Sequence, residues 1–292
     1  MEDLCFIILR YICCKISNNF WMHSYDCIRK LYPEVLIVIV DDMSPWRTDL
    51  KKPPERDNYK IIYSEKKGGE LLPYHILHQH QFAKKAIIIQ DSVFLQKKIP
   101  HSLISGCDTS LPLWVFRQYC AGCDGEDGPP SVQEKNIIEM INGFDKESKL
   151  ISFFSKKKLW KPYFGGMSII ALDFLNNILK QDNFINYFME QWKADPSNFN
   201  RKNRLYIETV IGLVLSFYGG QKLTVYGEIT GPEGSHGWFP WPEKGKSLCG
   251  RFGQKYTDYL KNNNKKPIEK IWACRGRKCR EEKENEKINI VI

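Results

Sequence analysis

Short apolar runs alternate with amphipathic stretches along the first ninety or so residues of the chain. The run Val35–Val40 contains six consecutive aliphatic residues, most of them β-branched, which is typical of a strand buried on both faces of a sheet. Amphipathic stretches between such runs indicate crossover helices and a parallel sheet. The predicted strands are Cys5–Ile12, Val35–Val40, Tyr59–Ser64 and Ala86–Ile89, and the predicted helices are Phe20–Leu31, with Ser17, Asn18 or Asn19 as its N-cap, and Leu71–Phe82.

The second half of the chain continues the pattern less regularly. It predicts helices at Val132–Ile141, Asp173–Lys180 and Arg204–Tyr218, a strand with a glycine pair at its mouth at Tyr163–Leu172, and a final strand at Leu223–Tyr226. Periodicity is lost over the last thirty or so residues. We therefore predict a single α/β, Rossmann-like domain over residues 1–260, with a mostly parallel central sheet flanked by helices, and a basic, partly mobile tail over residues 261–292.

Composition supports a folded chain in a reducing compartment. Of 292 residues, 42% are hydrophobic, which excludes disorder along the whole length. The ten cysteines are scattered through apolar segments, which favours buried thiols in a cytoplasmic protein over a disulfide framework. Charges at Glu2, Asp3 and Arg10 argue against a signal sequence, and no stretch approaches the roughly 20 apolar residues of a membrane span.

The formal net charge of +9 changes the range of expected partners. Such a charge suits nucleic acid, an acidic membrane surface or an anionic small substrate. The basic residues lie in short runs, and no nucleic-acid recognition motif accompanies them, so we expect no nucleic-acid partner. Basic runs of this kind are more often a solvated face of the protein than a stripe that binds nucleic acid.

Acidic residues follow two of the predicted strands directly. Asp41 and Asp42 end the run at Val40, and Gln90, Asp91 and Ser92 end the run at Ile89. In doubly wound sheets, ligands bind outside the carboxyl ends of the strands, where carboxylates can hold ribose hydroxyls or base N–H groups. A single such pair could equally cap the next turn. Two acidic strand ends in one parallel sheet can converge on one crevice, which favours a binding site.

These strand ends resemble those of the GT-A glycosyltransferases, in particular the small transferases found in the genomes of large DNA viruses. The resemblance covers about residues 4–230 and is carried by Ile37–Asp42, Gly69–Tyr74, Ala86–Phe94 and Phe164–Met167. It implies a GT-A fold and a hexosyl- or pentosyltransferase that moves a sugar from a nucleotide-diphosphate donor to a hydroxyl acceptor on a glycan or protein glycan. For a viral chain, the location would be the host cytoplasm. The nucleotide-binding residues that it implies are Asp41, Asp42, Gln90, Asp91 and Ser92.

The resemblance also implies a divalent metal, Mn²⁺ or Mg²⁺, held by Asp91 against the diphosphate. The family's Asp-x-Asp element reads Asp91-Ser92-Val93 here, so the second carboxylate is missing. Asp91 could act alone or with an oxygen of Ser92. Alternatively, basic residues such as Lys67 or Lys84 could hold the phosphates without any metal. The sequence leaves these alternatives open.

Four further residues are candidates for contact with the sugars. Gly165 and Gly166 would let backbone N–H groups approach donor or acceptor, unless they mark a bulge. Glu208 lies in an otherwise apolar helix, where an unpaired carboxylate is costly, so it is our candidate catalytic base. It could instead pair with Arg204, four residues earlier on the same face. Trp238 could stack on a sugar ring or simply pack in the core.

The missing second carboxylate leaves another function open. A non-catalytic protein of the same fold would bind glycans or a partner protein without transferring sugar. Replacement of Asp91 by alanine separates the two, because only an enzyme has donor turnover to lose.

Overall fold

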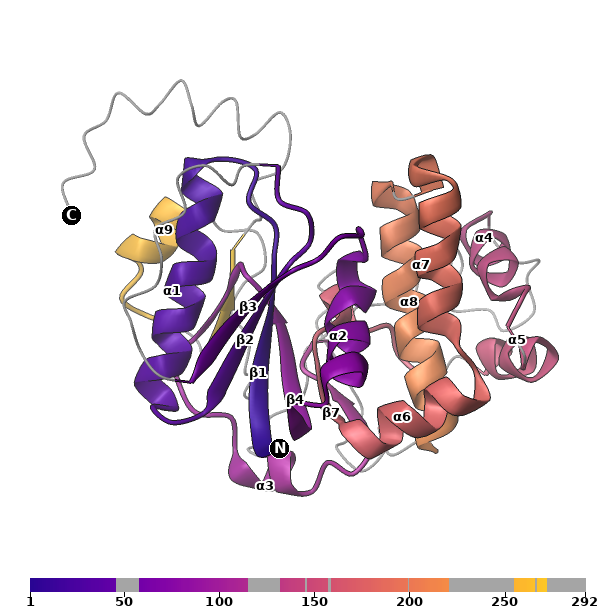
Figure 1. Cartoon of the computed structure of the whole chain (residues 1–292), viewed down its shortest axis with the longest axis horizontal. Helices are drawn as coiled ribbons and strands as arrows, with labels where there is room; N and C mark the ends of the chain where they lie inside the picture. The colour runs from indigo at the N-terminus through magenta and orange to yellow at the C-terminus, as the bar shows by residue number, and fades with distance from the viewer. Residues whose placement is uncertain are drawn as a thin grey trace.

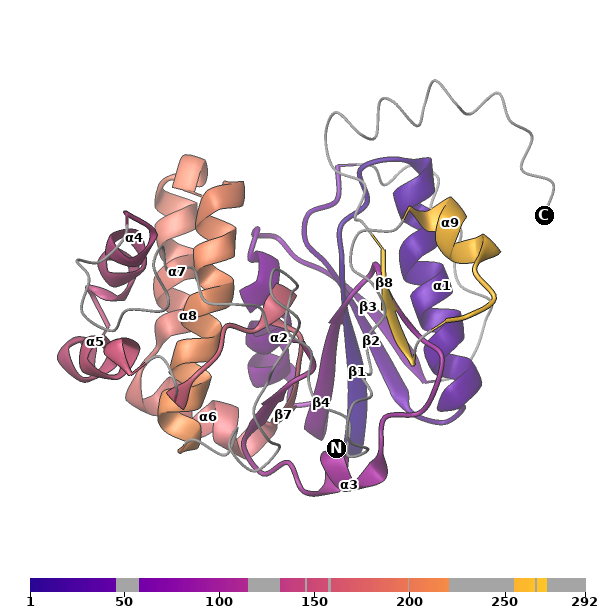
Figure 2. The ribbon, with the colours of Figure 1, turned by 180° about the vertical axis from the view of Figure 1, so that it is seen from behind.

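A six-stranded sheet lies in the middle of the described part of the molecule, with helices on both faces (Figures 1 and 2). The computed structural model describes residues 1–45, 58–114, 132–144, 146–156, 159–198, 200–220, 255–265 and 267–271. Strand order across the sheet is β3-β2-β1-β4-β7-β6. The strands are β1 (Glu2–Arg10), β2 (Leu36–Asp41), β3 (Tyr59–Tyr63), β4 (Ala83–Gln90), β6 (Ser110–Pro112) and β7 (Ser168–Ala171).

The predicted fold class is confirmed. Strands β1 to β4 are parallel, while β7 runs antiparallel to β4, and β6 runs antiparallel to β7. All four strands predicted in the first ninety residues are present, with bounds that differ by at most three residues. All six residues of β2 are buried, as its unbroken aliphatic run predicts for a central strand.

Helices divide the core into two hydrophobic layers. On one face, α1 (Lys15–Leu31) packs Trp21, Tyr25 and Ile28 against the sheet. On the other face, α2 (Leu72–His80) and α6 (Leu172–Gln181) join a larger cluster with four more helices. These four are α4 (Val132–Ile141), α5 (Glu147–Ser155), α7 (Phe184–Ala194) and α8 (Arg201–Gly219). The remaining elements are η1 (Gly69–Leu71), η3 (Phe164–Gly166), η4 (Pro196–Asn198), α3 (His101–Ser105), α9 (Tyr256–Lys261), β5 (Val93–Leu95) and β8 (Ile268–Lys270).

Helix α1 begins five residues earlier than predicted, at Lys15 instead of Phe20. Cys14 is its N-cap, and the Ser17 hydroxyl accepts the backbone N–H groups of Cys13 and Cys14, both at 3.0 Å. The prediction that the N-cap lies between residues 17 and 19 is therefore wrong. Polar side chains in the first turn satisfy free backbone groups, so Ser17 supports this helix from inside its first turn.

A short strand from the predicted tail returns to the body of the molecule. Strand β8 pairs antiparallel with β5, with Lys270 opposite Val93 and Ile268 opposite Leu95. Figure 2 shows β8 and α9 on the α1 side of the sheet. Tyr256 of α9 contacts His23 of α1, with 2.9 Å between its hydroxyl oxygen and the ring Nδ1. Residues 261–265 and 267–271 of the predicted tail are described, whereas the predicted strand at 223–226 lies outside the described residues.

No helix within the described ranges combines the length and the apolar character needed to cross a bilayer. The cytoplasmic location stays a prediction. The hydrophobic residues of α8 pack in the core, where Ile207, Val210 and Leu213 are fully buried.

Helix α8 packs against backbone at Gly212, so Gly212→Ala tests how tightly this helix is seated. An added Cβ would lie 2.1 Å from the carbonyl oxygen of Lys161 and 2.8 Å from the Cα of Pro162. Because backbone cannot rotate away, we expect a loss of about 1–3 kcal/mol in the free energy of unfolding, measured in urea. In the control Gly219→Ala, the nearest neighbour is the Phe174 ring at 3.5 Å, and stability should hold or rise. Equal effects of the two substitutions would contradict this packing.

Candidate functional site

The register of β1 brings the two acidic strand ends to one edge of the sheet. Leu9 pairs with Val40 on one side and with Gln90 on the other, so β2 and β4 end within one residue of the same level. Asp42 and Asp91 follow these ends and line a single pocket. Its lining residues are Leu9, Tyr11, Asp42, Gln90, Asp91 and Arg204, and its volume is about 10 Å³.

Asp41 lies behind this pocket in a buried ion pair. Its carboxylate accepts the Nε–H of Arg10 at 2.9 Å, and the backbone N–H and the hydroxyl of Ser44 at 3.0 and 2.6 Å. Arg10 is also fully buried, and its guanidinium lies 4.9 Å from the centre of the Trp21 ring. The pair joins the ends of β1 and β2. Nucleotide binding by Asp41 stays a prediction. Its carboxylate already accepts hydrogen bonds from Arg10 and Ser44.

Asp42 fixes the loop that follows β3. Its Oδ1 accepts the backbone N–H groups of Gly68 at 2.8 Å and Gly69 at 3.3 Å. Burial, which leaves Asp42 only 3% exposed, raises its pKa to about 6, and the neighbouring carboxylate of Glu70 acts in the same direction. The two glycine N–H groups and the Arg204 guanidinium lower this pKa. Asp42 therefore titrates close to neutral pH.

The residues at the end of β4 contact a lysine from β8. The Nζ of Lys270 donates to the Gln90 Oε1 at 2.7 Å and to the Ser92 Oγ at 2.8 Å. Between them in sequence, Asp91 accepts the backbone N–H of Tyr11 through Oδ2 at 3.0 Å. Lys270 is only 3% exposed, so its amino group is held inside the protein beside the strand end.

A second ion pair lies on the other side of the pocket. The guanidinium of Arg204 donates from Nε to the Glu70 Oε2 at 2.9 Å and from Nη2 to the Glu70 Oε1 at 2.5 Å. This forked geometry matches a planar guanidinium to a carboxylate. The sequence suggested Glu208 as a partner of Arg204. The structure adds Glu70 as a partner that the sequence did not indicate.

Glu208 projects from α8 toward the same groups. It is 7% exposed, and its Oε2 has no hydrogen-bond partner among the described residues. Burial raises its pKa to about 8, and the nearby Glu70 adds to this. A backbone hydrogen bond from Gly165 and the charges of Arg204 and Lys270 act in the opposite direction. A carboxyl group with this pKa exchanges its proton near neutral pH.

Burial is the main cause of the raised pKa values of Asp42 and Glu208. Four carboxyl groups share this region with two cationic side chains, and the charge of Glu70 raises the pKa values of Asp42 and Glu208 further. We call these side chains and their two neutral neighbours the strand-end cluster. It consists of Asp42, Glu70, Gln90, Asp91, Ser92, Arg204, Glu208 and Lys270.

The glycine pair lies in a turn just ahead of β7, so the strand predicted from Tyr163 begins only at Ser168. Gly165 and Gly166 have φ values of 62° and 65°, which favour glycine, and belong to η3, just before β7. A Cβ on Gly165 would lie 2.7 Å from the Gln90 Nε2, and one on Gly166 would lie 3.0 Å from the Glu70 carbonyl oxygen. The missing side chains thus let the turn pack on the strand-end cluster. Their role toward donor or acceptor stays a prediction, and Trp238 lies outside the described residues.

The oxygen donors around Asp91 do not fit a divalent cation. Mg²⁺ and Mn²⁺ favour several oxygen ligands, usually with more than one negative charge. Here Asp91 offers one carboxylate, and the adjacent oxygens of Gln90 and Ser92 accept hydrogen bonds from Lys270. The described part of the chain holds no group of three or more His, Cys, Asp or Glu residues placed to bind a metal ion. Metal binding by Asp91 stays a prediction.

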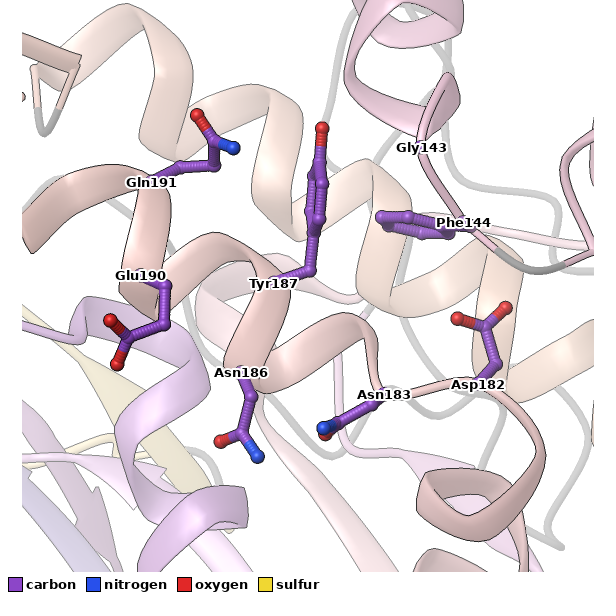
Figure 3. A pocket seen from close by; sticks show the side chains of 8 residues that line it. All are labelled: Gly143, Phe144, Asp182, Asn183, Asn186, Tyr187, Glu190 and Gln191. Atoms are coloured by element: carbon purple, nitrogen blue, oxygen red, sulfur yellow. The ribbon is translucent and has the colours of Figure 1, made fainter. Parts of the chain in front are cut away.

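A larger pocket of about 330 Å³ lies among the helices beyond the sheet (Figure 3). Residues of α7 and of its connection to α6 line one side, with Gly143 and Phe144 opposite. No predicted site residue lines it. We place the candidate site at the strand ends, because that is where the charged side chains converge.

Three members of the strand-end cluster were not predicted as site residues from the sequence. Glu70 lies in the segment Gly69–Tyr74, which entered only through the family resemblance and without a role for this residue. Arg204 was considered only as a partner of Glu208. Lys270 carried no signal, because it lies 180 residues from Gln90 in a segment rich in charge.

Comparisons with known proteins leave the family of this chain open. No protein-family model matches it, and no curated protein sequence matches it. Among solved structures it is similar to S. aureus TarS 1-349, with 15% identity and a TM-score of 0.35 over 61% of this chain and 48% of that one. The complex of TarS with UDP gives 13% identity and a TM-score of 0.28, covering 56% of each chain. The complex with UDP-GlcNAc gives 12% and 0.30, covering 61% of this chain and 47% of that one.

The chain spans about half the length of the solved structures that it matches. Similarity at this level supports no inference about function. The chemistry of the strand-end cluster therefore has to carry the proposal.

The raised pKa of Glu208 predicts how stability depends on pH. The folded protein keeps a proton up to about pH 8 that the unfolded chain releases near pH 4.5, so this group's contribution to the free energy of unfolding falls as pH rises between these values. Glu208→Gln cannot ionise, so the variant should lose less stability than the wild type between pH 5 and 8 in urea titrations. The control Glu190→Gln changes an exposed carboxyl group whose pKa is lowered, chiefly by a hydrogen bond from Lys66. Parallel curves for wild type and Glu208→Gln would contradict the assignment.

Proposed function

We propose that this protein is a glycosyltransferase that moves a sugar from a nucleotide-diphosphate donor to a hydroxyl acceptor on a glycan or protein glycan. One observation carries the proposal: Asp42 and Asp91 leave different parallel strands and line the same pocket, together with Arg204. Nucleotides bind at this edge of doubly wound sheets, outside the carboxyl ends of the strands. The position and the side chains both suit a ligand that carries ribose and phosphates.

Each side chain takes a role that follows from its place in the pocket. Asp42 would accept hydrogen bonds from the nucleoside, and Asp91 would lie beside the diphosphate. Arg204 would supply a guanidinium to the phosphate oxygens, a geometry that it already uses toward Glu70. Since the pocket has room for about one water molecule, the donor would lie across its mouth or the lining side chains would move apart.

Glu208 is our candidate for the proton transfer. In the reaction, the acceptor oxygen bonds to the anomeric carbon of the sugar, and the bond from that carbon to the diphosphate oxygen breaks. The electron pair of that bond stays on the leaving nucleotide diphosphate, and the hydroxyl proton passes to the base. A base works best when its pKa lies near the working pH, and the pKa of Glu208 is about 8. Gly165 and Gly166 would border the acceptor.

Calorimetric titration with uridine and guanosine diphosphates, with and without Mn²⁺, tests the proposal. We expect at least one of them to bind, and Asp42→Asn and Asp91→Ala to weaken binding by at least about tenfold, since each removes a charged hydrogen-bonding group. Donor hydrolysis, followed by chromatography of the released nucleotide, should fall in parallel.

Asp173→Ala is the matched control for these variants. Asp173 is an exposed carboxylate at the start of α6, which lies at the opposite end of the sheet from the pocket (Figure 1). Its loss should leave nucleotide binding unchanged. A folded wild-type protein that binds neither diphosphate at millimolar concentration would overturn the proposal, and binding without donor turnover would favour a non-catalytic module.

A further inference from the structure

The Lys270 amino group lies at the end of β4, hydrogen-bonded to the two residues that flank Asp91 in sequence. It joins the side-chain oxygens of the residues before and after Asp91, at 2.7 Å from Gln90 and 2.8 Å from Ser92. Those two oxygens are the neutral ligands nearest in sequence that a metal at Asp91 could recruit. A dication bound there would have to displace the ammonium or lie against its positive charge.

The fold holds this lysine in place. Strand β8 pairs with β5 directly after the β4 turn, which sets Lys270 opposite Val93. The ammonium also lies 5.8 Å from the centre of the Phe164 ring, within the range of a cation–π contact. Burial of a lysine is costly unless its amino group is hydrogen-bonded. Lys270 is only 3% exposed, and its two hydrogen bonds to Gln90 and Ser92 offset that cost.

We propose that Lys270 takes the place of the divalent cation, so that this protein binds a nucleotide diphosphate without metal. The inference rests on the proposed function, which it makes more specific. Leaving-group charge on a diphosphate can be balanced by a lysine as well as by a metal ion, although a lysine acts as a point charge.

Lys270 acts through its neighbours and is therefore a positioning residue. Gln90 and Asp91 line the pocket, and the ammonium lies one hydrogen bond behind Gln90. A buried charge is weakly screened, so it attracts phosphate across such a distance more strongly than an exposed lysine would. The same hydrogen bond orients the Gln90 amide, whose Nε2 faces the Glu70 Oε1 at 3.5 Å.

The first test needs only the wild-type protein. Affinities for uridine and guanosine diphosphates are measured by calorimetry in EDTA and then in millimolar Mn²⁺ or Mg²⁺. We expect the dissociation constant to stay within about twofold, well under the tenfold that 1.4 kcal/mol represents. Binding that appears only with a divalent cation would overturn this inference and leave the proposed function standing. No diphosphate binding under either condition would overturn both.

The second test removes the charge. Lys270→Met keeps the length of the side chain and should weaken diphosphate binding at least about tenfold, as expected for loss of a charged partner. Binding of the matching nucleoside, followed by NMR, should stay unchanged, because a nucleoside carries no phosphate. Lys265→Met is the control, since it removes the same charge from the same segment, at a residue that contacts the Tyr259 ring. Equal losses for nucleoside and diphosphate in Lys270→Met would show a purely structural role and overturn the inference, whichever way the variant's stability changes.

Discussion

The hydrogen-bond register of β1 with both of its neighbours is the constraint on which the candidate site depends. Because Leu9 is level with Val40 and with Gln90, two carboxylates that are far apart in sequence leave the sheet side by side. A slip of one residue on either side would turn the strand's side chains to the opposite faces of the sheet and separate the pair. The Arg10–Asp41 ion pair lies at this level and ties β1 to β2 where the register matters most.

The strand-end cluster is a buried polar network with more acids than cations. Such networks stabilise a fold only when their members are satisfied, and a proton on Glu208, whose pKa is raised to about 8, relieves part of the excess negative charge. An incoming anion would enlarge that excess. The cluster therefore suits an anionic ligand only if its cations are placed close to that ligand, which makes the positions of Arg204 and Lys270 central to its chemistry.

Sequence patterns revealed the part of this fold that is local. The aliphatic run of β2 and the matching run of β4 predicted buried parallel strands, and the acids that follow them predicted where a ligand would bind. Short strands such as β5 and β8 gave no signal, because three residues are too few to show an alternation. Partners such as Glu70 for Arg204 could not be predicted, since they meet through helix packing across 134 residues of sequence. Burial, which sets the pKa of Glu208, is likewise a property of the packed core.

Strand β8 comes late in the chain but carries a residue of the site next to β4, so the site is completed late in translation. A ribosome releases β1 to β4 early, and these strands can pair while the remainder is still being translated. Lys270 emerges 180 residues after Gln90, and also after Arg204, so the growing polypeptide presents these acids before the second cation of the cluster exists. Translation halted upstream of β8 would yield a product with the sheet intact and the ammonium missing. Such a fragment would be expected to fold in its core yet attract stray cations at the unfinished edge.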